Sequence, residues 1–215
     1  MKRLFIAINL PPHQMRIGAE GAKNNKSSLW CGGLPEKSNC VRCKIRYLIE
    51  ILKPISDSNF RWLSPENWHL TPIFLGYQPD EAINPILNSL KETVKNLPPP
   101  TVEFEKIIYG PPGRPARMIW LTGTKETSKK LDEIKKYLEN ELTENGVKFQ
   151  RENRPYNAHL TLARFQSSQQ SNQNKLPNYP IHQLSFISQS LDLMESYLKR
   201  TGAEYEILSK MDFIK

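Results

Sequence analysis

The sequence predicts an α+β fold in which helices pack against antiparallel sheets. Its expected strands and helices alternate and end in a run of strands, a pattern typical of this class. A five-residue segment also occurs twice, at 67–71 and 157–161, with four identical positions. A chain of 215 residues can form one globular domain or two small lobes that share a cleft. The repeated segment favours two related halves.

Hydrophobic periodicity gives each expected element its place. Apolar residues that recur every three or four positions predict helices, and short apolar or alternating runs predict strands. The expected helices cover 41–53, 80–97 and 124–145. The expected strands cover 4–10, 61–77, 101–108, 117–122 and 158–165, followed by 181–190 and 203–209, which are expected to form a hairpin.

The repeated segment carries the candidate functional residues. It reads Asn-Trp-His-Leu-Thr in the first copy and Asn-Ala-His-Leu-Thr in the second. Side chains two residues apart in a strand point to the same face, so His69 lies beside Thr71 and His159 beside Thr161. Two imidazoles that titrate near neutral pH, next to two hydroxyl groups, suit proton transfer at a compact anion. One such segment would indicate only a strand, whereas the duplication favours a function.

The charge distribution indicates what the protein binds. The net charge is +8, and residues 1–60 hold 10 Lys/Arg against 4 Asp/Glu. A basic surface favours a polyanionic partner such as nucleic acid, with ordinary solubilising charge as the alternative.

No apolar run approaches the roughly 20 residues of a membrane span. An odd number of cysteines forms no disulfide framework, so a cytoplasmic protein is expected.

The three cysteines, Cys31, Cys40 and Cys43, lie close together in the chain. With His13 they could form a four-ligand zinc site, but their spacing is not that of a standard zinc motif. A reduced, basic insertion at about 14–40 is the favoured alternative. Neither a metal nor a cofactor is expected.

These motifs resemble those of the 2H phosphoesterase superfamily, and within it the RNA 2′,3′-cyclic phosphodiesterases, also called LigT-like or 2′-5′ RNA ligase proteins. The family is marked by two His-x-Thr/Ser-x motifs, which here are 69–72 and 159–162. Further similar segments are 3–11, 69–76, 117–121, 159–164 and 190–208. The family usually has an aliphatic residue where this chain has Pro72. Because proline cannot donate to a strand ladder, this strand is expected at a sheet edge or with a bulge.

The resemblance implies a particular architecture. It implies two pseudo-symmetric lobes of antiparallel sheet with helices on their outer faces and an active-site cleft between them. Residues 1–215 would form a single LigT-like domain that carries the insertion at about 14–40.

The resemblance also implies an activity, the hydrolysis of RNA 2′,3′-cyclic phosphate ends to 2′-phosphates without a metal. His69 would donate a proton and His159 would accept one. Thr71 and Thr161 would bind the phosphate oxygens. In reverse, the same site could join RNA through a 2′-5′ linkage. Arg164 and Arg117 would add positive charge at the substrate, with surface ion pairs as the alternative.

Two alternatives remain open. The site could act on another cyclic or 2′-5′ nucleotide, or the protein could bind RNA without catalysis, although binding alone needs no acid and base. Four aromatic residues near the motifs could stack on a base, with core packing favoured: Trp68, Trp120, Tyr156 and Phe165. The expected partner is RNA or a nucleotide with a 2′,3′-cyclic phosphate. The protein is expected to be a monomer and to have no membrane partner.

Overall fold

The computed structural model describes residues 1–12, 40–55, 60–165, 176, 181, 183–199 and 202–214. The strands in this part of the chain are β1 (Lys2–Asn9), β2 (Arg61–Trp62), β3 (His69–Gln78), β4 (Thr101–Gly110), β5 (Met118–Gly123), β6 (His159–Arg164), β7 (Ser185–Ile187), β8 (Ser190–Lys199) and β9 (Gly202–Asp212). The α-helices are α1 (Val41–Leu52), α2 (Ile83–Asn96) and α3 (Lys125–Glu144). Short 3₁₀ turns cover Lys53–Ile55, Pro65–Asn67 and Asp80–Ala82.

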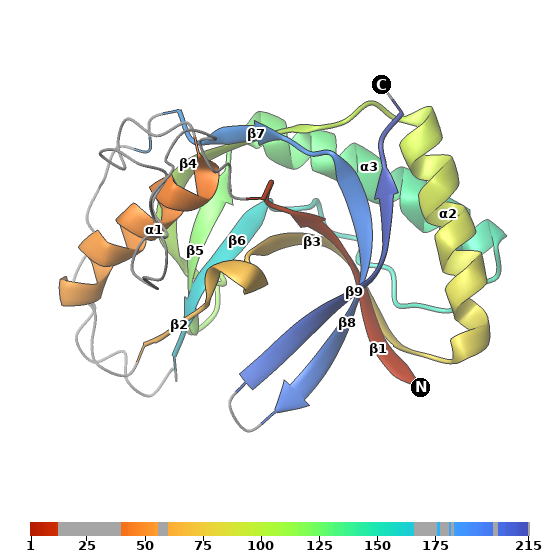
Figure 1. Cartoon of the computed structure of the whole chain (residues 1–215), viewed down its shortest axis with the longest axis horizontal. Coiled ribbons are helices and arrows are strands. Elements are labelled where there is room, and N and C mark those ends of the chain that lie inside the picture. Colours follow the sequence, from red (N-terminus) through yellow and green to blue (C-terminus); the bar gives the residue numbers. More distant parts are fainter. Residues whose placement is uncertain are drawn as a thin grey trace, which may run out of the picture.

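The strands form two antiparallel sheets, which confirms the α+β prediction (Figure 1). One sheet has the order β3-β1-β8-β9 and the other has the order β2-β6-β5-β4-β7. Each sheet therefore contains one of the two motif strands, β3 or β6. Helix α1 lies at the opposite end of the molecule from α2, while α2 and α3 pack against each other (Figure 1).

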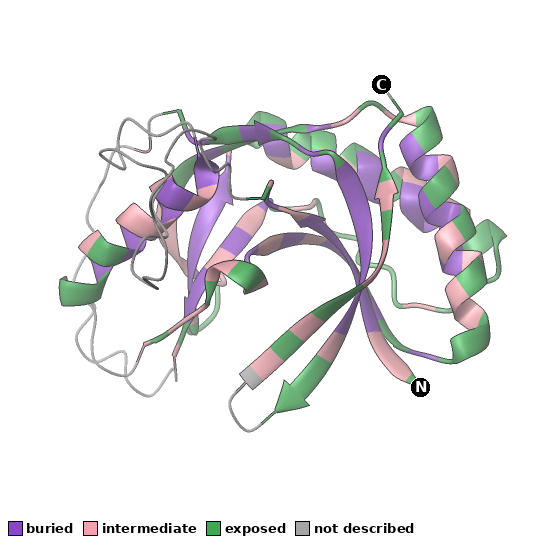
Figure 2. Ribbon diagram, in the orientation of Figure 1, coloured by how far each residue is buried: buried purple, intermediate pink, exposed green. Residues whose placement is uncertain are grey.

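Strand β1 is buried on both faces, and its alternating residues belong to different clusters. Leu4, Ile6 and Ile8 lie in the main core, together with residues of α2 and α3. Phe5 and Ala7 face the other side, where they form a small second cluster with Met194. The centre of this sheet is buried, whereas Tyr197, Leu198 and Lys199 at the end of β8 are exposed (Figure 2). The face of β1 that carries Phe5 is the one on which the candidate site is built.

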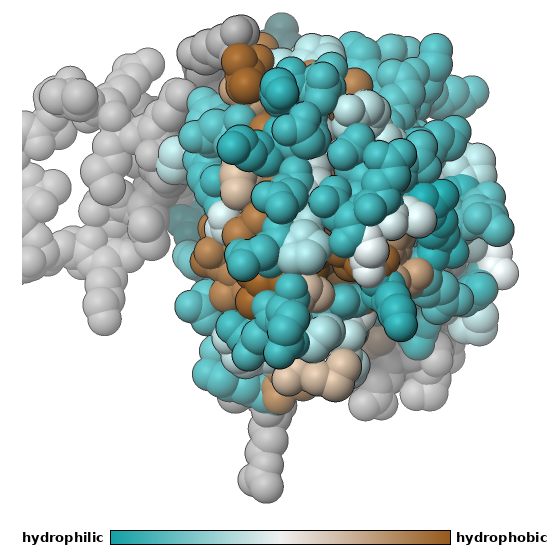
Figure 3. Space-filling view, turned by 90° about the vertical axis from the view of Figure 1, so that its right-hand side faces the viewer, coloured by the Kyte–Doolittle hydropathy of each residue, from teal (hydrophilic) through white to brown (hydrophobic). Residues whose placement is uncertain are grey.

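The helices begin and end much as their sequences predict. The expected apolar face of α1 is buried, and so is that of α3. Thr124 caps α3 by accepting a hydrogen bond of 3.1 Å from the backbone N–H of Thr127. Gly146, with a φ of +74°, follows the end of the helix in the left-handed conformation that favours glycine. The side that carries α2 shows mainly hydrophilic side chains with hydrophobic ones between them (Figure 3), as expected for an amphipathic helix.

Two of the strand predictions were wrong. The expected strand 61–77 is broken, because Pro65 starts a 3₁₀ turn that separates β2 from β3. The expected hairpin of 181–190 with 203–209 is also incorrect. β9 pairs with β8, from Ser190–Asp212 to Lys199–Gly202, whereas β7 pairs with β4 in the other sheet. The buried carboxylates Asp192 and Glu195 interrupt the apolar pattern of β8 and conceal it in the sequence.

No helix in the described ranges is long and apolar enough to cross a membrane.

Candidate active site

The two motif strands share the same local irregularity. In β3, Leu70 pairs with Ile8 and Ile73 pairs with Ile6, so two residues of β3 lie opposite one residue of β1. This is a β-bulge that contains Thr71 and Pro72. β3 is also an edge strand. Both expectations for Pro72 are therefore confirmed, since an unpaired bulge position in an edge strand tolerates a residue without an N–H.

The same bulge occurs in β6. Thr161 pairs with Trp120 and Ala163 pairs with Ile119, which leaves Leu162, the counterpart of Pro72, as the extra residue. Because directly paired residues point to the same face, the register places His159, Thr161 and Arg164 on one face of the sheet. Without the bulge, Arg164 would point to the opposite face. The bulge thus adds a cation to the face of the histidine.

In β3 the equivalent position is Phe74. Its register with Phe5, and that of His69 with Asn9, places Phe74 on the same face as His69 and Thr71. Phe74 is 62% exposed, and its ring centroid lies 6.1 Å from that of Phe5. The two half-sites therefore share their histidine, their threonine and their bulge. On the strand face that carries the histidine and the threonine, they differ at this position, which is arginine in β6 and phenylalanine in β3.

His159 is held by two contacts. Its ring stacks on the indole of Trp120, with centroids 3.8 Å apart and an angle of 25° between the planes. Its Nδ1 lies 2.8 Å from the backbone carbonyl of Asn157. A carbonyl oxygen can only accept a hydrogen bond, so Nδ1 carries the proton and donates. The neutral ring then has Nε2 free to accept a proton, as a general base must.

His69 lies among aromatic rings. Its centroid is 5.1 Å from that of Phe5 and 4.8 Å from that of Tyr205, which meets it edge-on. Its Nδ1 is buried and makes no hydrogen bond to any other described residue. The nearby carbonyl of Asn67 still favours the protonated ring, although its geometry lies outside that of a hydrogen bond.

The pKa values of both histidines are lowered. Burial is the main cause for His69, whose pKa falls from 6.5 to about 4, and the positive charges of Arg164 and His159 lower it further. Burial also lowers the pKa of His159, with Arg154 and Arg164 adding to the effect. Arg164 acts on both histidines and His159 acts on His69, so these three groups lie near one another.

The remaining predicted residues are placed as follows. Thr71 and Thr161 are partly exposed on the faces of their histidines. Arg117 directly precedes β5, opposite Phe165, whose N–H donates a hydrogen bond of 2.9 Å to the backbone carbonyl of Arg117. Its side chain is exposed. Trp68 lies in the main core, in agreement with the favoured alternative for the aromatic residues.

The packing behind His159 was not apparent from the sequence. A Cβ atom at Gly110 would lie 2.4 Å from Cδ2 of Trp120, so only glycine allows the β4 backbone to lie flat on the indole. Trp120 is thus packed between Gly110 and His159. The Gly-Pro-Pro-Gly segment predicts a turn at 110–113, but it does not show that its first glycine supports a histidine.

Gly110→Ala is expected to lower both the melting temperature and the turnover number. The added methyl group must displace the indole or the strand, and overpacking of this kind costs about 1–3 kcal/mol. A displaced indole also moves His159. Thermal denaturation and steady-state kinetics measure the two effects. The double variant Gly110→Ala/Trp120→Phe should recover part of the stability, because the smaller ring leaves room; unchanged stability and turnover in Gly110→Ala would contradict this account.

Part of the candidate zinc site lies within the described residues. Cys40 and Cys43 are buried at the start of α1, whereas His13 and Cys31 lie outside the described residues, as does most of the expected insertion. Within the described ranges, no three His, Cys, Asp or Glu side chains are grouped so that they could hold a metal ion.

Comparisons with known proteins agree with this geometry. Residues 40–120 and 122–186 match the sequence profile of the family described as LigT like Phosphoesterase. The chain is similar to the RNA 2′,3′-cyclic phosphodiesterase of Bacillus subtilis (strain 168), with 28% identity over 148 residues, which are 68% of this chain and 78% of that protein. It is also similar to the protein of the same name from Thermotoga maritima, with 25% identity over 166 residues, 76% of this chain and 86% of that protein. Among solved structures, E. coli LigT in its apo form has a similar fold, with a TM-score of 0.64, 21% identity, and coverage of 98% of this chain and 96% of that chain.

Proposed function

Because the chain belongs to the LigT-like phosphoesterase family, we propose that it hydrolyses 2′,3′-cyclic phosphate ends of RNA to 2′-phosphates. The observation that carries the proposal is the pair of histidines in one site, each with a hydroxyl group on its own face and with Arg164 acting on both. The names of the two bacterial relatives support the choice of substrate. Both half-sites come from one chain, so a monomer suffices.

The reaction requires one proton to be removed and one to be supplied. Water attacks phosphorus in line with the ribose O3′, and the P–O3′ bond breaks. His159 accepts the proton of the water through its free Nε2, and His69 donates a proton to O3′. The product carries a 2′-phosphate and a free 3′-hydroxyl. The low pKa of His69 makes its protonated form a stronger acid than an ordinary imidazolium, and the negative charge of the bound phosphate raises the fraction of His69 that is protonated.

The other site residues would stabilise the phosphate. Thr71 and Thr161 can each donate a hydrogen bond to a non-bridging oxygen from opposite half-sites. Arg164 adds a positive charge where negative charge increases during the attack. A site with fixed donors and a cation carries out this chemistry with protein groups alone.

The proposal is tested with adenosine 2′,3′-cyclic phosphate in the presence of EDTA. We expect complete conversion to 2′-AMP without 3′-AMP, resolved by ion-exchange chromatography. Parallel reactions with a 2′-5′ dinucleotide and with ADP-ribose 1″,2″-cyclic phosphate compare the alternative substrates by kcat/KM. The proposal is wrong if the nucleoside 2′,3′-cyclic phosphates are not hydrolysed, or if activity in EDTA appears only after a divalent ion is added.

The pH dependence should reflect the lowered pKa values. The active form has one proton on the histidine pair, so the rate is highest between the two apparent pKa values. Both values lie below 6.5 in the free protein, so the kcat/KM profile should be centred below pH 6.5. A bound phosphate anion favours protonated histidine and raises both pKa values, so the kcat profile should lie at higher pH. Profiles from pH 4 to 9 test this, and a kcat/KM optimum above the kcat optimum would contradict it.

A further inference from the structure

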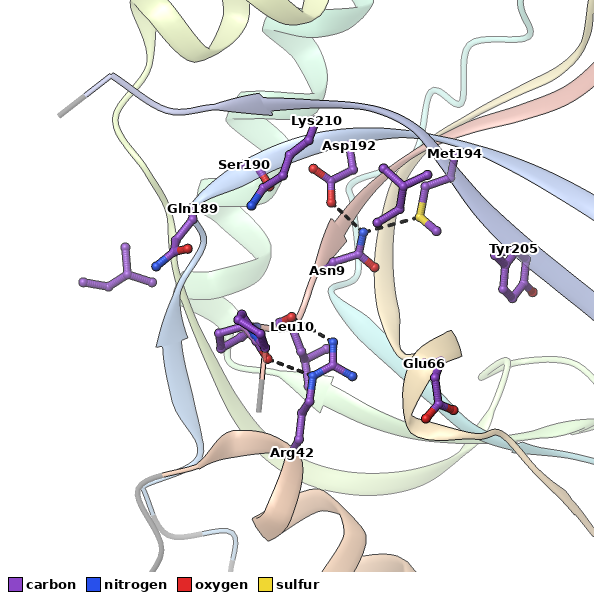
Figure 4. Close-up of a pocket in the computed structure, with 14 residues that line it drawn as sticks. Asn9, Leu10, Arg42, Glu66, Gln189, Ser190, Asp192, Met194, Tyr205 and Lys210 are labelled. Atoms are coloured by element: carbon purple, nitrogen blue, oxygen red, sulfur yellow. Dashed lines mark hydrogen bonds between the residues drawn. The ribbon is translucent and has the colours of Figure 1, made fainter. Parts of the chain in front are cut away.

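A cavity of about 330 Å³ opens on the same face of the β3-β1-β8-β9 sheet as His69 (Figure 4). This volume lies in the range of about 300–1,000 Å³ that is usual for small-molecule pockets. Its walls come from the end of β1, from β8 and β9, and from Arg42 of α1 and Glu66. They include exposed apolar side chains, among them Ile187 and Ile207. Walls that combine apolar and polar side chains suit a flat ligand with an apolar body and hydrogen-bonding groups at its edge.

The polar groups at the floor of this cavity are held in a fixed orientation. Asp192 is only 2% exposed, and its Oδ2 accepts a hydrogen bond of 2.6 Å from Nδ2 of Asn9. The same Nδ2 lies 3.5 Å from Sδ of Met194. A carboxylate can only accept hydrogen bonds, so the NH₂ group of Asn9 must point toward Asp192. The amide oxygen of Asn9 then points away from Asp192 (Figure 4). The cavity therefore contains a fixed hydrogen-bond acceptor.

The charges around the cavity do not favour a second phosphate. Two carboxylates line it, Asp192 and Glu66, as well as two cations, Arg42 and Lys210. Arg42 is already engaged, since its guanidinium donates to the backbone carbonyls of Leu10, Pro11 and Pro65. A balanced set of charges with an engaged arginine suits a neutral group. The oxygen of Asn9 selects a group that presents an N–H.

The cavity is next to the catalytic histidine. Asn9 pairs directly with His69 across the β1–β3 ladder, and side chains so paired lie about 5 Å apart on the same face. Tyr205 lines the cavity and also packs edge-on against the ring of His69. A group bound in the cavity therefore lies within the reach of a nucleoside whose cyclic phosphate is bound at His69.

We propose that this cavity is the nucleobase subsite, and that the amide oxygen of Asn9, oriented by Asp192, accepts a hydrogen bond from an exocyclic amino group of the base. The proposal rests on the proposed phosphodiesterase function and adds to it a preference for the base. Bases with an amino group are favoured over analogues that lack it, because the acceptor is otherwise left unpaired.

The first test compares substrates that differ by one amino group. Adenosine 2′,3′-cyclic phosphate is compared with the purine riboside analogue, and the guanosine compound with the inosine compound. The parent protein should lose about tenfold in kcat/KM in at least one pair when the amino group is removed. Asn9→Leu removes the acceptor. In this variant the ratio of kcat/KM with the amino group to kcat/KM without it should fall to near one. A ratio taken within one variant is independent of any general loss of activity.

A second variant tests the cavity without changing Asn9. Ile187→Trp places a larger side chain in the wall of the cavity, and Ile214→Trp is a matched control outside it. The two isoleucines are 61% and 63% exposed, so neither change should disturb the core. Ile187→Trp should raise KM for the adenosine substrate at least fivefold and leave KM for methyl riboside 2′,3′-cyclic phosphate, which has no base, unchanged. Ile214→Trp should leave both values unchanged.

The outcomes separate the two proposals. If the parent hydrolyses the substrate without a base, but both amino-group ratios are near one and Ile187→Trp behaves like Ile214→Trp, the subsite is refuted and the proposed function stands. If the parent hydrolyses no 2′,3′-cyclic phosphate at all, both proposals fail. Ratios that are the same in Asn9→Leu and in the parent would also reject Asn9 as the acceptor.

Discussion

Replacing either His69 or His159 by alanine is expected to lower kcat for cyclic phosphate hydrolysis by about 10²–10⁴-fold. Each ring carries out one of the two proton transfers, so the removal of either ring stops the concerted reaction. The double variant should lose little more than either single variant, because groups that act as a unit are not additive. Single-turnover kinetics at the optimum pH of each variant measure the loss directly.

The control for this prediction is chemical rescue. Both rings lie at the surface of the core, and their removal should leave the circular dichroism spectrum unchanged. Added imidazole should restore part of the rate to each alanine variant, since it supplies the missing acid or base. Turnover within a factor of about five of the parent in either variant would exclude that histidine as an acid or base.

Arg164→Met is expected to lower kcat/KM by about 10²-fold, close to the loss seen when a donor to a developing charge is removed. It should also move both pH profiles to higher pH. The charge of Arg164 lowers the pKa of both histidines, so its removal raises both values. A structural role would lower the rate without this shift, which makes the pH profile the decisive measurement.

Arg117→Met is the matched comparison. Arg117 precedes Met118, which is the strand partner of Arg164, and the hydrogen bonds that hold Arg117 are made by its backbone, which any residue provides. Its loss of kcat/KM should be at least ten times smaller than that of Arg164→Met, and the pH optimum should stay in place. Equal losses in the two variants would show that both arginines act on the substrate.

The placement of each candidate histidine beside a threonine on one strand face could be predicted, because the segment that contains them is repeated and strand side chains alternate. The face on which Arg164 lies could not be derived from the alternation of strand side chains, because the bulge at Leu162 shifts the following residues to the opposite face. The pairing of the last strands was hidden by the charged residues inside β8. Asn9 and Asp192 form a pair only once β1 and β8 lie side by side, and they are 183 residues apart in the chain.

The difference between Phe74 and Arg164 has a consequence for how many ways a substrate can bind. Two identical half-sites would hold a small phosphate diester equally well in either of two orientations, and only one of them would align the leaving oxygen with His69. The substrate itself is asymmetric, with an anion at one end and an uncharged nucleoside at the other. A cation in one half and an aromatic ring in the other give the two orientations unequal free energies. This pair of positions thus favours one direction of binding, together with the different rings that pack against the two histidines.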